Sequence, residues 1–232
     1  DIKWHPNQSL TLDATIFPDF GQVEADQVIL NLTNFEQFLP ERRPFFLEGI
    51  DILSTPFQLL YTRRLGRAPY APALPENETQ IGRSKRATIY GAAKLTGEIN
   101  SKTSVGGVLA MTAPVEVDVR DTKGRTISRI AEPAAAFKVL RLRRDINSRT
   151  FVGLTATAKS HVDTPSSYPK VGTNEILCPD GSQVRQGQRC FHNAYVVGVD
   201  GRWRSQGGDY VLSGQAIGSL IHEGPPRTMA DG

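Results

Sequence analysis

Three glutamates in the first third of the chain, Glu36, Glu41 and Glu48, are candidates for the acidic pair of a glycosidase. Cleavage of a glycosidic bond needs two carboxyl groups at a set separation, one acting as acid and the other as base or nucleophile. The spacing of these three singles out no pair, and no serine lies in a Gly-x-Ser-x-Gly turn. The sequence therefore identifies no reaction, and we predict no catalytic residue.

Metal-binding patterns are equally weak. Four acidic residues lie between positions 13 and 26, but they lack the fixed spacing of a calcium-binding loop, so ion pairing and capping explain them better. They are Asp13, Asp19, Glu24 and Asp26. The four histidines are far apart in the sequence and none has the spacing of helical metal ligands: His5, His161, His192 and His222. We predict no metal and no cofactor.

The two cysteines, Cys178 and Cys190, flank a polar, glycine-containing stretch. Two cysteines so placed favour a disulfide, which implies an oxidising compartment. Two free thiols or half of a metal site are the alternatives. Metal binding is disfavoured because there is no Cys-x-x-Cys spacing and His192 alone does not complete a ligand set.

Charged residues interleaved with phenylalanine mark the segment from residue 41 to residue 66. Buried charges must be compensated by partners, so we predict an ion-pair cluster that packs inside or beneath a β-barrel. Its members are Glu41, Arg42, Arg43, Glu48, Arg63 and Arg64.

The elements that would position these residues are β-strands with strict alternation, which starts at Ala87 and continues through Gly218. Val152, Leu154, Ala156 and Ala158, for example, share one face of their strand, because successive side chains point to opposite sides. Six strands of about nine to eleven residues are predicted, a length that crosses a bilayer at a steep tilt. They cover 87–97, 104–112, 134–144, 151–159, 195–203 and 210–220.

Short and long connections alternate between these strands. The turns at 98–102, 145–148 and 204–209 are short, whereas 113–132 and 160–192 are long and polar. An up-and-down barrel of the outer membrane has this arrangement, with short periplasmic turns and long outer loops. An ordinary antiparallel sheet with one buried face has the same alternation and is the alternative.

Composition limits the function classes. The 232 residues carry a formal net charge of only +3, which argues against nucleic-acid binding. No apolar run is long enough for a membrane-spanning helix. The basic group Arg83, Lys85 and Arg86 is best interpreted as a strand-end anchor near lipid headgroups. The chain starts at Asp1 without a signal peptide and has too few strands to close a barrel, so we expect a fragment whose remaining strands follow Gly232.

The first third of the chain has a different sequence pattern from the strictly alternating remainder. Ser9–Ile16 alternates like a strand, and Val28–Leu39 has a helical tendency that Pro40 ends. We therefore divide the chain into an N-terminal segment, 1–86, which holds the charged, phenylalanine-rich region, and a region of antiparallel transmembrane strands, 87–232.

Three motifs carry a resemblance to a known family: Pro18–Asp26, Leu39–Gly49 and Tyr61–Gly66. With weaker matches at Gly91–Gly97, Leu142–Ile146 and Asn193–Gly218, they resemble a bacterial outer-membrane β-barrel family, domain of unknown function 5916. In that family the barrel commonly follows a family-nine-type carbohydrate-binding module, which this chain lacks. The resemblance implies an all-β, antiparallel up-and-down transmembrane barrel, here partial, and no chemistry.

These observations predict an outer-membrane barrel that acts as a channel, a transporter or a surface-binding platform, with a link to carbohydrate uptake. Its expected partners are outer-membrane lipid, lipopolysaccharide or glycan, and other envelope proteins. A soluble β-sandwich that binds carbohydrate is one alternative, although Trp4 and Trp203 are too few and too separated for an aromatic row. A barrel hydrolase at the cell surface is the other.

Overall fold

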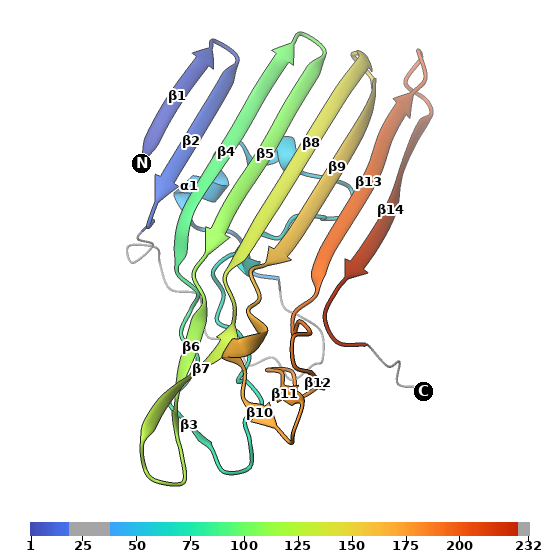
Figure 1. The fold of residues 1–232 in the computed structure, drawn as a ribbon. Helices are drawn as coiled ribbons and strands as arrows, with labels where there is room; N and C mark the ends of the chain where they lie inside the picture. The colour runs from blue at the N-terminus through green and yellow to red at the C-terminus, as the bar shows by residue number, and fades with distance from the viewer. Residues whose placement is uncertain (19–37, 227–232) are drawn as a thin grey trace.

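One antiparallel sheet of eight strands forms the centre of the computed structural model, which describes residues 1–18 and 38–226 (Figure 1). In spatial order the strands are β1 (Ile2–Asn7), β2 (Leu10–Ile16), β4 (Ile89–Asn100), β5 (Thr103–Thr112), β8 (Ala135–Asn147), β9 (Thr150–His161), β13 (Asn193–Arg204) and β14 (Val211–His222). Spatial order follows chain order, so the sheet is an up-and-down meander. The all-β antiparallel prediction is confirmed, but the sheet is open: β1 and β14 are its edges, and the described strands do not close a barrel.

The connections are segregated by length between the two ends of the sheet (Figure 1). Turns at 8–9, 101–102, 148–149 and 205–210 join the strands at one end. The long connections 17–88, 113–134 and 162–192 all leave from the other end. The predicted alternation of short and long connections is therefore present in the fold.

Two small sheets are built from the long connections. One contains β3 (Thr79–Ile81), β6 (Val115–Arg120) and β7 (Thr126–Glu132), and the other contains β10 (Lys170–Val171), β11 (Glu175–Leu177) and β12 (Gln183–Arg185). The predicted long connections 113–132 and 160–192 therefore contain short strands that the sequence pattern did not assign. The first of these folds as the hairpin β6–β7, because Val115, Val117 and Val119 alternate into the interior.

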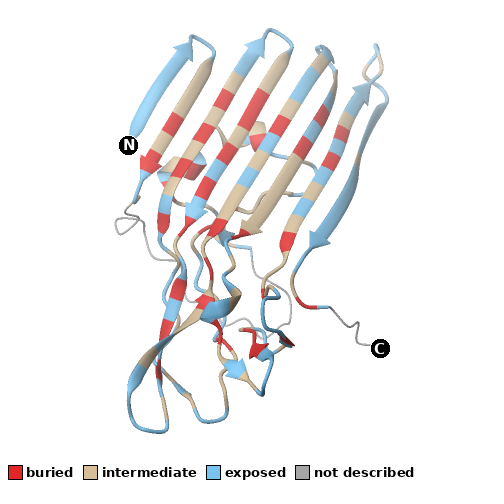
Figure 2. Cartoon of the chain, in the orientation of Figure 1, coloured by how far each residue is buried: buried red, intermediate tan, exposed pale blue. Residues whose placement is uncertain are grey.

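Buried and exposed residues alternate along inner strands of the eight-stranded sheet such as β4, β5 and β13, so the two faces of the sheet differ in burial (Figure 2). On β5, Val108 and Ala110 are buried, while Leu109 and Met111 on the opposite face are 48% and 50% exposed. Residues 38–65, which we name the covering segment, lie against the first face and include α1 (Pro44–Leu47), η1 (Ile50–Leu53) and η2 (Thr62–Arg64). Phe46, Leu53 and Leu65 of this segment form a core with sheet residues such as Val108.

The N-terminal part departs from prediction at one strand. Ser9–Ile16 forms β2 as expected. The preceding β1 was not assigned as a separate strand: Ile2 and Trp4 alternate with polar residues, but Pro6 disfavours a strand. Proline is tolerated there because β1 is an edge strand. The helical tendency predicted for Val28–Leu39 falls outside the described residues as far as position 37. Within the described ranges, no helix has the length and apolarity needed to cross a membrane.

Candidate functional site

Lys94 ties the covering segment to the middle of the sheet. Its side chain is 2% exposed, and Nζ donates hydrogen bonds of 2.7 Å to the carbonyl oxygens of both Phe45 and Glu48. The carboxylate of Asp13 on β2 lies 3.3 Å away and balances the charge. Alternation places Lys94 on the covered face of β4, where its buried charge is balanced by Asp13.

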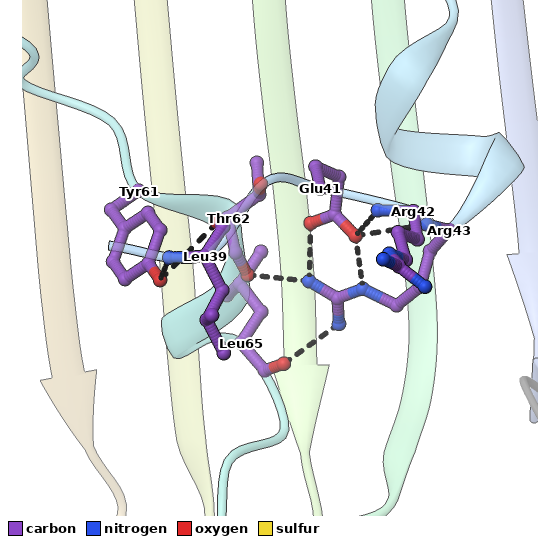
Figure 3. A network of polar contacts seen from close by, with 7 residues as sticks. All are labelled: Leu39, Glu41, Arg42, Arg43, Tyr61, Thr62 and Leu65. Carbon is purple, nitrogen blue, oxygen red and sulfur yellow. Dashed lines mark hydrogen bonds and ion pairs between the residues drawn. The ribbon is translucent and has the colours of Figure 1, made fainter. Parts of the chain in front are cut away.

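Arg43 organises the covering segment itself (Figure 3). Its guanidinium donates two hydrogen bonds to the Glu41 carboxylate, from Nε at 2.8 Å and from Nη2 at 2.7 Å. It also donates to the carbonyl oxygens of Thr62 at 2.6 Å and Leu65 at 2.8 Å. Burial acts to raise the pKa of Glu41, but the hydrogen bonds from Arg43 and Thr62 together outweigh it and hold that pKa below its usual value. This network joins the two ends of the covering segment.

A second buried ion pair lies within the sheet. Arg141 on β8 reaches across β9 to Asp200 on β13, with hydrogen bonds of 2.7 and 2.9 Å to the two carboxylate oxygens. The same guanidinium donates to Thr155 Oγ1 at 2.7 Å. A Cβ at Gly153 would come within 2.7 Å of Asp200 Oδ1, so only glycine leaves room for the pair. Three strands are thereby linked by side chains on the covered face.

Glycines also let the covering segment approach the sheet. A Cβ at Gly106 would lie 2.7 Å from Leu53 Cδ2, and one at Gly198 would lie 2.7 Å from Leu59 Cδ1. Beside Gly198, Gln215 on β14 accepts a 2.6 Å hydrogen bond from the backbone N–H of Phe57. The segment is therefore fitted to the sheet from β4 to β14.

The fit predicts different outcomes for two neighbouring glycines of β5. Gly106→Val should lower the free energy of unfolding by about 1–3 kcal/mol, because the new methyl groups overlap the packed Leu53 side chain. Gly107→Val is the matched control, since its Cβ points to the other face and meets nothing closer than 3.6 Å. Urea unfolding measures both. Equal effects would contradict tight packing of the segment.

The predicted ion-pair cluster is divided in the structure. Glu41 and Arg43 are paired, and the backbone N–H of Arg42 also donates to Glu41. Glu48 instead forms an ion pair with Lys3 of β1. The remaining two members, Arg63 and Arg64, lie in η2.

The disulfide prediction is confirmed. Cys178 and Cys190 are joined, with their Cα atoms 5.2 Å apart. Around them a small core forms from Tyr168, Ile176 and Val184. The bridge therefore stabilises a compact lobe at the long-loop end of the sheet, where too few apolar residues are available to do so alone.

A charged cluster connects the hairpin β6–β7 to the main sheet. Lys159 Nζ donates a 2.7 Å hydrogen bond to Glu132, and His161 Nε2 lies 3.7 Å from the same carboxylate. Burial acts to raise the pKa of Glu132, but these two neighbours outweigh it and lower that pKa to about 2.

This shift predicts acid sensitivity of the hairpin attachment. The folded pKa of Glu132 lies below its ordinary value of 4.5, so the stabilisation is present above pH 4.5 and is lost as the pH falls toward 2. Glu132→Gln should flatten the dependence of stability on pH in that window. Urea unfolding between pH 2 and pH 6 tests this, and an unchanged slope would refute the contribution of Glu132.

The predicted acidic and histidine candidates do not form a metal centre in the part of the chain that the structure describes. There, no three His, Cys, Asp or Glu side chains gather as metal ligands. Asp13, one of the predicted acidic group, instead faces Lys94, and the other three lie outside the described residues. Of the glycosidase candidates, Glu41 and Glu48 are engaged by Arg43 and Lys3, and Glu36 is not described.

Comparison with known proteins gives one match. The family model described as "Domain of unknown function (DUF5916)" matches residues 1–164, which is more than half of the chain. The chain belongs to this family. The match covers the covering segment and the strands through β9. No curated protein and no solved structure matches.

Proposed function

We propose that this chain forms part of the wall of an outer-membrane β-barrel whose interior is partly filled by the covering segment. The observation that supports this most strongly is the apolar character of the uncovered face. On β13, for example, Val197 and Val199 are 49% and 53% exposed. Exposed apolar surface of this extent marks a contact with a membrane or with another protein.

The distribution of charge along the uncovered face favours lipid as that contact. On β8, Leu140 and Leu142 share this face with Lys138 toward one end of the strand and Arg144 toward the other. A lipid-facing strand has this order, because charges cost little near the interfaces and about 2–4 kcal/mol at the bilayer midplane. A face buried against another protein domain has no need of charged margins.

Strand length agrees with a membrane crossing. The six long strands of the main sheet, β4, β5, β8, β9, β13 and β14, are 10 to 13 residues long, and a tilted transmembrane strand needs about 9–11 residues. Closure requires that the unpaired edges of β1 and β14 find partners, since unsatisfied backbone groups are not tolerated in lipid. In this arrangement the disulfide lobe is extracellular and the short turns are periplasmic.

The covered face then belongs to the lumen, and the covering segment narrows it. A barrel so obstructed acts as a gated channel, a transporter or a platform that presents its outer lobe to glycans at the cell surface. A link to carbohydrate uptake and contacts with lipopolysaccharide or other envelope proteins belong to this proposal. The alternative of a sugar-binding sandwich is disfavoured, because the uncovered face carries mainly Leu, Val, Ala and Gly, and its exposed tryptophans Trp4 and Trp203 lie on strands toward opposite edges of the sheet.

Membrane fractionation tests the proposal. The full-length protein, expressed with its natural flanking sequence in a Gram-negative host, should sediment with the outer membrane and resist extraction with alkaline carbonate. Detergent should release it, and its migration on an SDS gel should change on heating. Recovery in the soluble fraction without detergent would overturn the proposal.

A further inference from the structure

A basic pocket lies at the short-turn end of the covered face, away from the covering segment's ion pairs. Its volume is about 500 Å³. Five basic side chains and one carboxylate line it: Lys102, Arg143, Arg149, Arg202, Arg204 and Asp145. The whole chain has a formal net charge of only +3, so this concentration of positive charge is local.

The pocket is pre-organised by contacts among its lining residues. The Arg143 guanidinium is held 3.0 Å from the Asp145 carboxylate and 4.0 Å over the Phe151 ring. Arg149 donates to the carbonyl oxygen of Gln206, and the Arg204 Nε donates to that of Gly208 at 3.4 Å. These contacts orient guanidinium groups whose donors are suited to bidentate recognition of oxyanions.

Four of the five lining cations have no acidic partner within the described residues, and only Arg143 is paired with a carboxylate, that of Asp145. Within residues 1–18 and 38–226, neither the Lys102 ammonium nor the Arg202 guanidinium is paired with a carboxylate. Arg202 shares the covered face of β13 with Asp200, and its strand neighbour across the ladder is Phe151. Like charges collected around one concavity repel one another unless an anion enters.

We infer that this pocket binds small soluble molecules that carry a phosphate or carboxylate group. The inference of anion binding depends only on the residues that line the pocket. The location of the pocket at the periplasmic mouth of a pore rests on the proposed function. The expected ligand is soluble because the pocket opens on the covered face, opposite the face that would meet lipid headgroups.

Calorimetric titration of the full-length protein in detergent micelles at low salt tests the inference. Inorganic phosphate and glucuronate should bind saturably, neutral glucose should not, and added sodium chloride should weaken binding by screening. Arg202→Gln should weaken the affinity for phosphate about tenfold, as expected for loss of one charge-assisted hydrogen bond.

Arg144→Gln is the matched control, because Arg144 lies at the same end of the sheet on the opposite face, where it donates to Thr103. It should leave the affinity unchanged within about twofold. Lys102→Gln, in an exposed turn, should weaken binding as well and guards against misfolding of the arginine variant. Absence of saturable anion binding, or equal losses for Arg202→Gln and Arg144→Gln, would overturn the inference. If the protein is soluble and the barrel proposal fails, the same titration can be run in buffer without detergent. Loss of the anion-binding inference is therefore distinguishable from loss of the barrel proposal.

Discussion

Asp200→Ala is expected to lower the free energy of unfolding by about 3–5 kcal/mol, the largest effect of any substitution considered for this protein. The side chains of Arg141 and Asp200 are 3% and 1% exposed, so the variant leaves a buried guanidinium without its counter-charge. Thr155 supplies only one neutral acceptor. Urea unfolding measures the loss of unfolding free energy, in detergent micelles or in buffer, whichever keeps the protein folded.

A double-mutant cycle separates the ion pair from simple loss of packing. Arg141→Met combined with Asp200→Leu should cost clearly less than the sum of the two single replacements, because removal of both charges leaves no unpaired ion. The control Asp209→Ala changes an aspartate in the turn between β13 and β14 and should shift stability by no more than about 0.5 kcal/mol. Additive effects in the cycle would show that the pair does not hold the three strands together.

Val197→Arg is expected to destabilise the membrane-embedded protein by about 2–4 kcal/mol. Val197 lies on the uncovered face in the row that contains Leu140, between the charged margins at Lys138 and Arg144. A guanidinium at this depth would have to leave water for hydrocarbon. If the same face were exposed to solvent, the replacement would change stability by only about 0.5 kcal/mol.

Val196→Arg is the matched control for this substitution. It makes the same chemical change one residue earlier on β13, where the side chain points to the covered, half-buried face. A wet lumen tolerates arginine, so this variant should cost less than Val197→Arg. Folding into lipid vesicles, followed by urea unfolding, compares the two. A smaller cost at Val197 than at Val196 would argue for a conventional protein core on the covered face and water on the other.

Much of the sheet could be predicted because a period of two is visible locally. Alternation located the six long strands, and the cysteine spacing located the disulfide. The β1 strand was not assigned because its alternation is short and Pro6 interrupts it, although Ile2 and Trp4 pair with Ala14 and Leu12 of β2. The hairpin β6–β7 could have been predicted from the alternation of valines between Val115 and Val119. The charged residues between those valines made the stretch look like a polar loop.

The contacts that define the covered face depend on register and could not be read from local pattern. Arg141 and Asp200 are separated by 59 residues and meet only because β9 places both beside Thr155 and Gly153. Glu48 was grouped with the arginines by proximity in sequence, but the fold brings Lys3 to it from β1. The basic pocket was missed for the same reason, since its residues come from three separate turns and strand ends.

Spin labels along β13 test most directly whether the uncovered face meets lipid. Cysteine would replace Ala194, Tyr195, Val196, Val197 and Val199 one at a time, in full-length protein reconstituted into vesicles. Labels at 195, 197 and 199 should be accessible to oxygen and shielded from a water-soluble nickel complex, and those at 194 and 196 should not share this behaviour. Free access of the nickel complex to 197 and 199 would contradict a lipid-facing sheet.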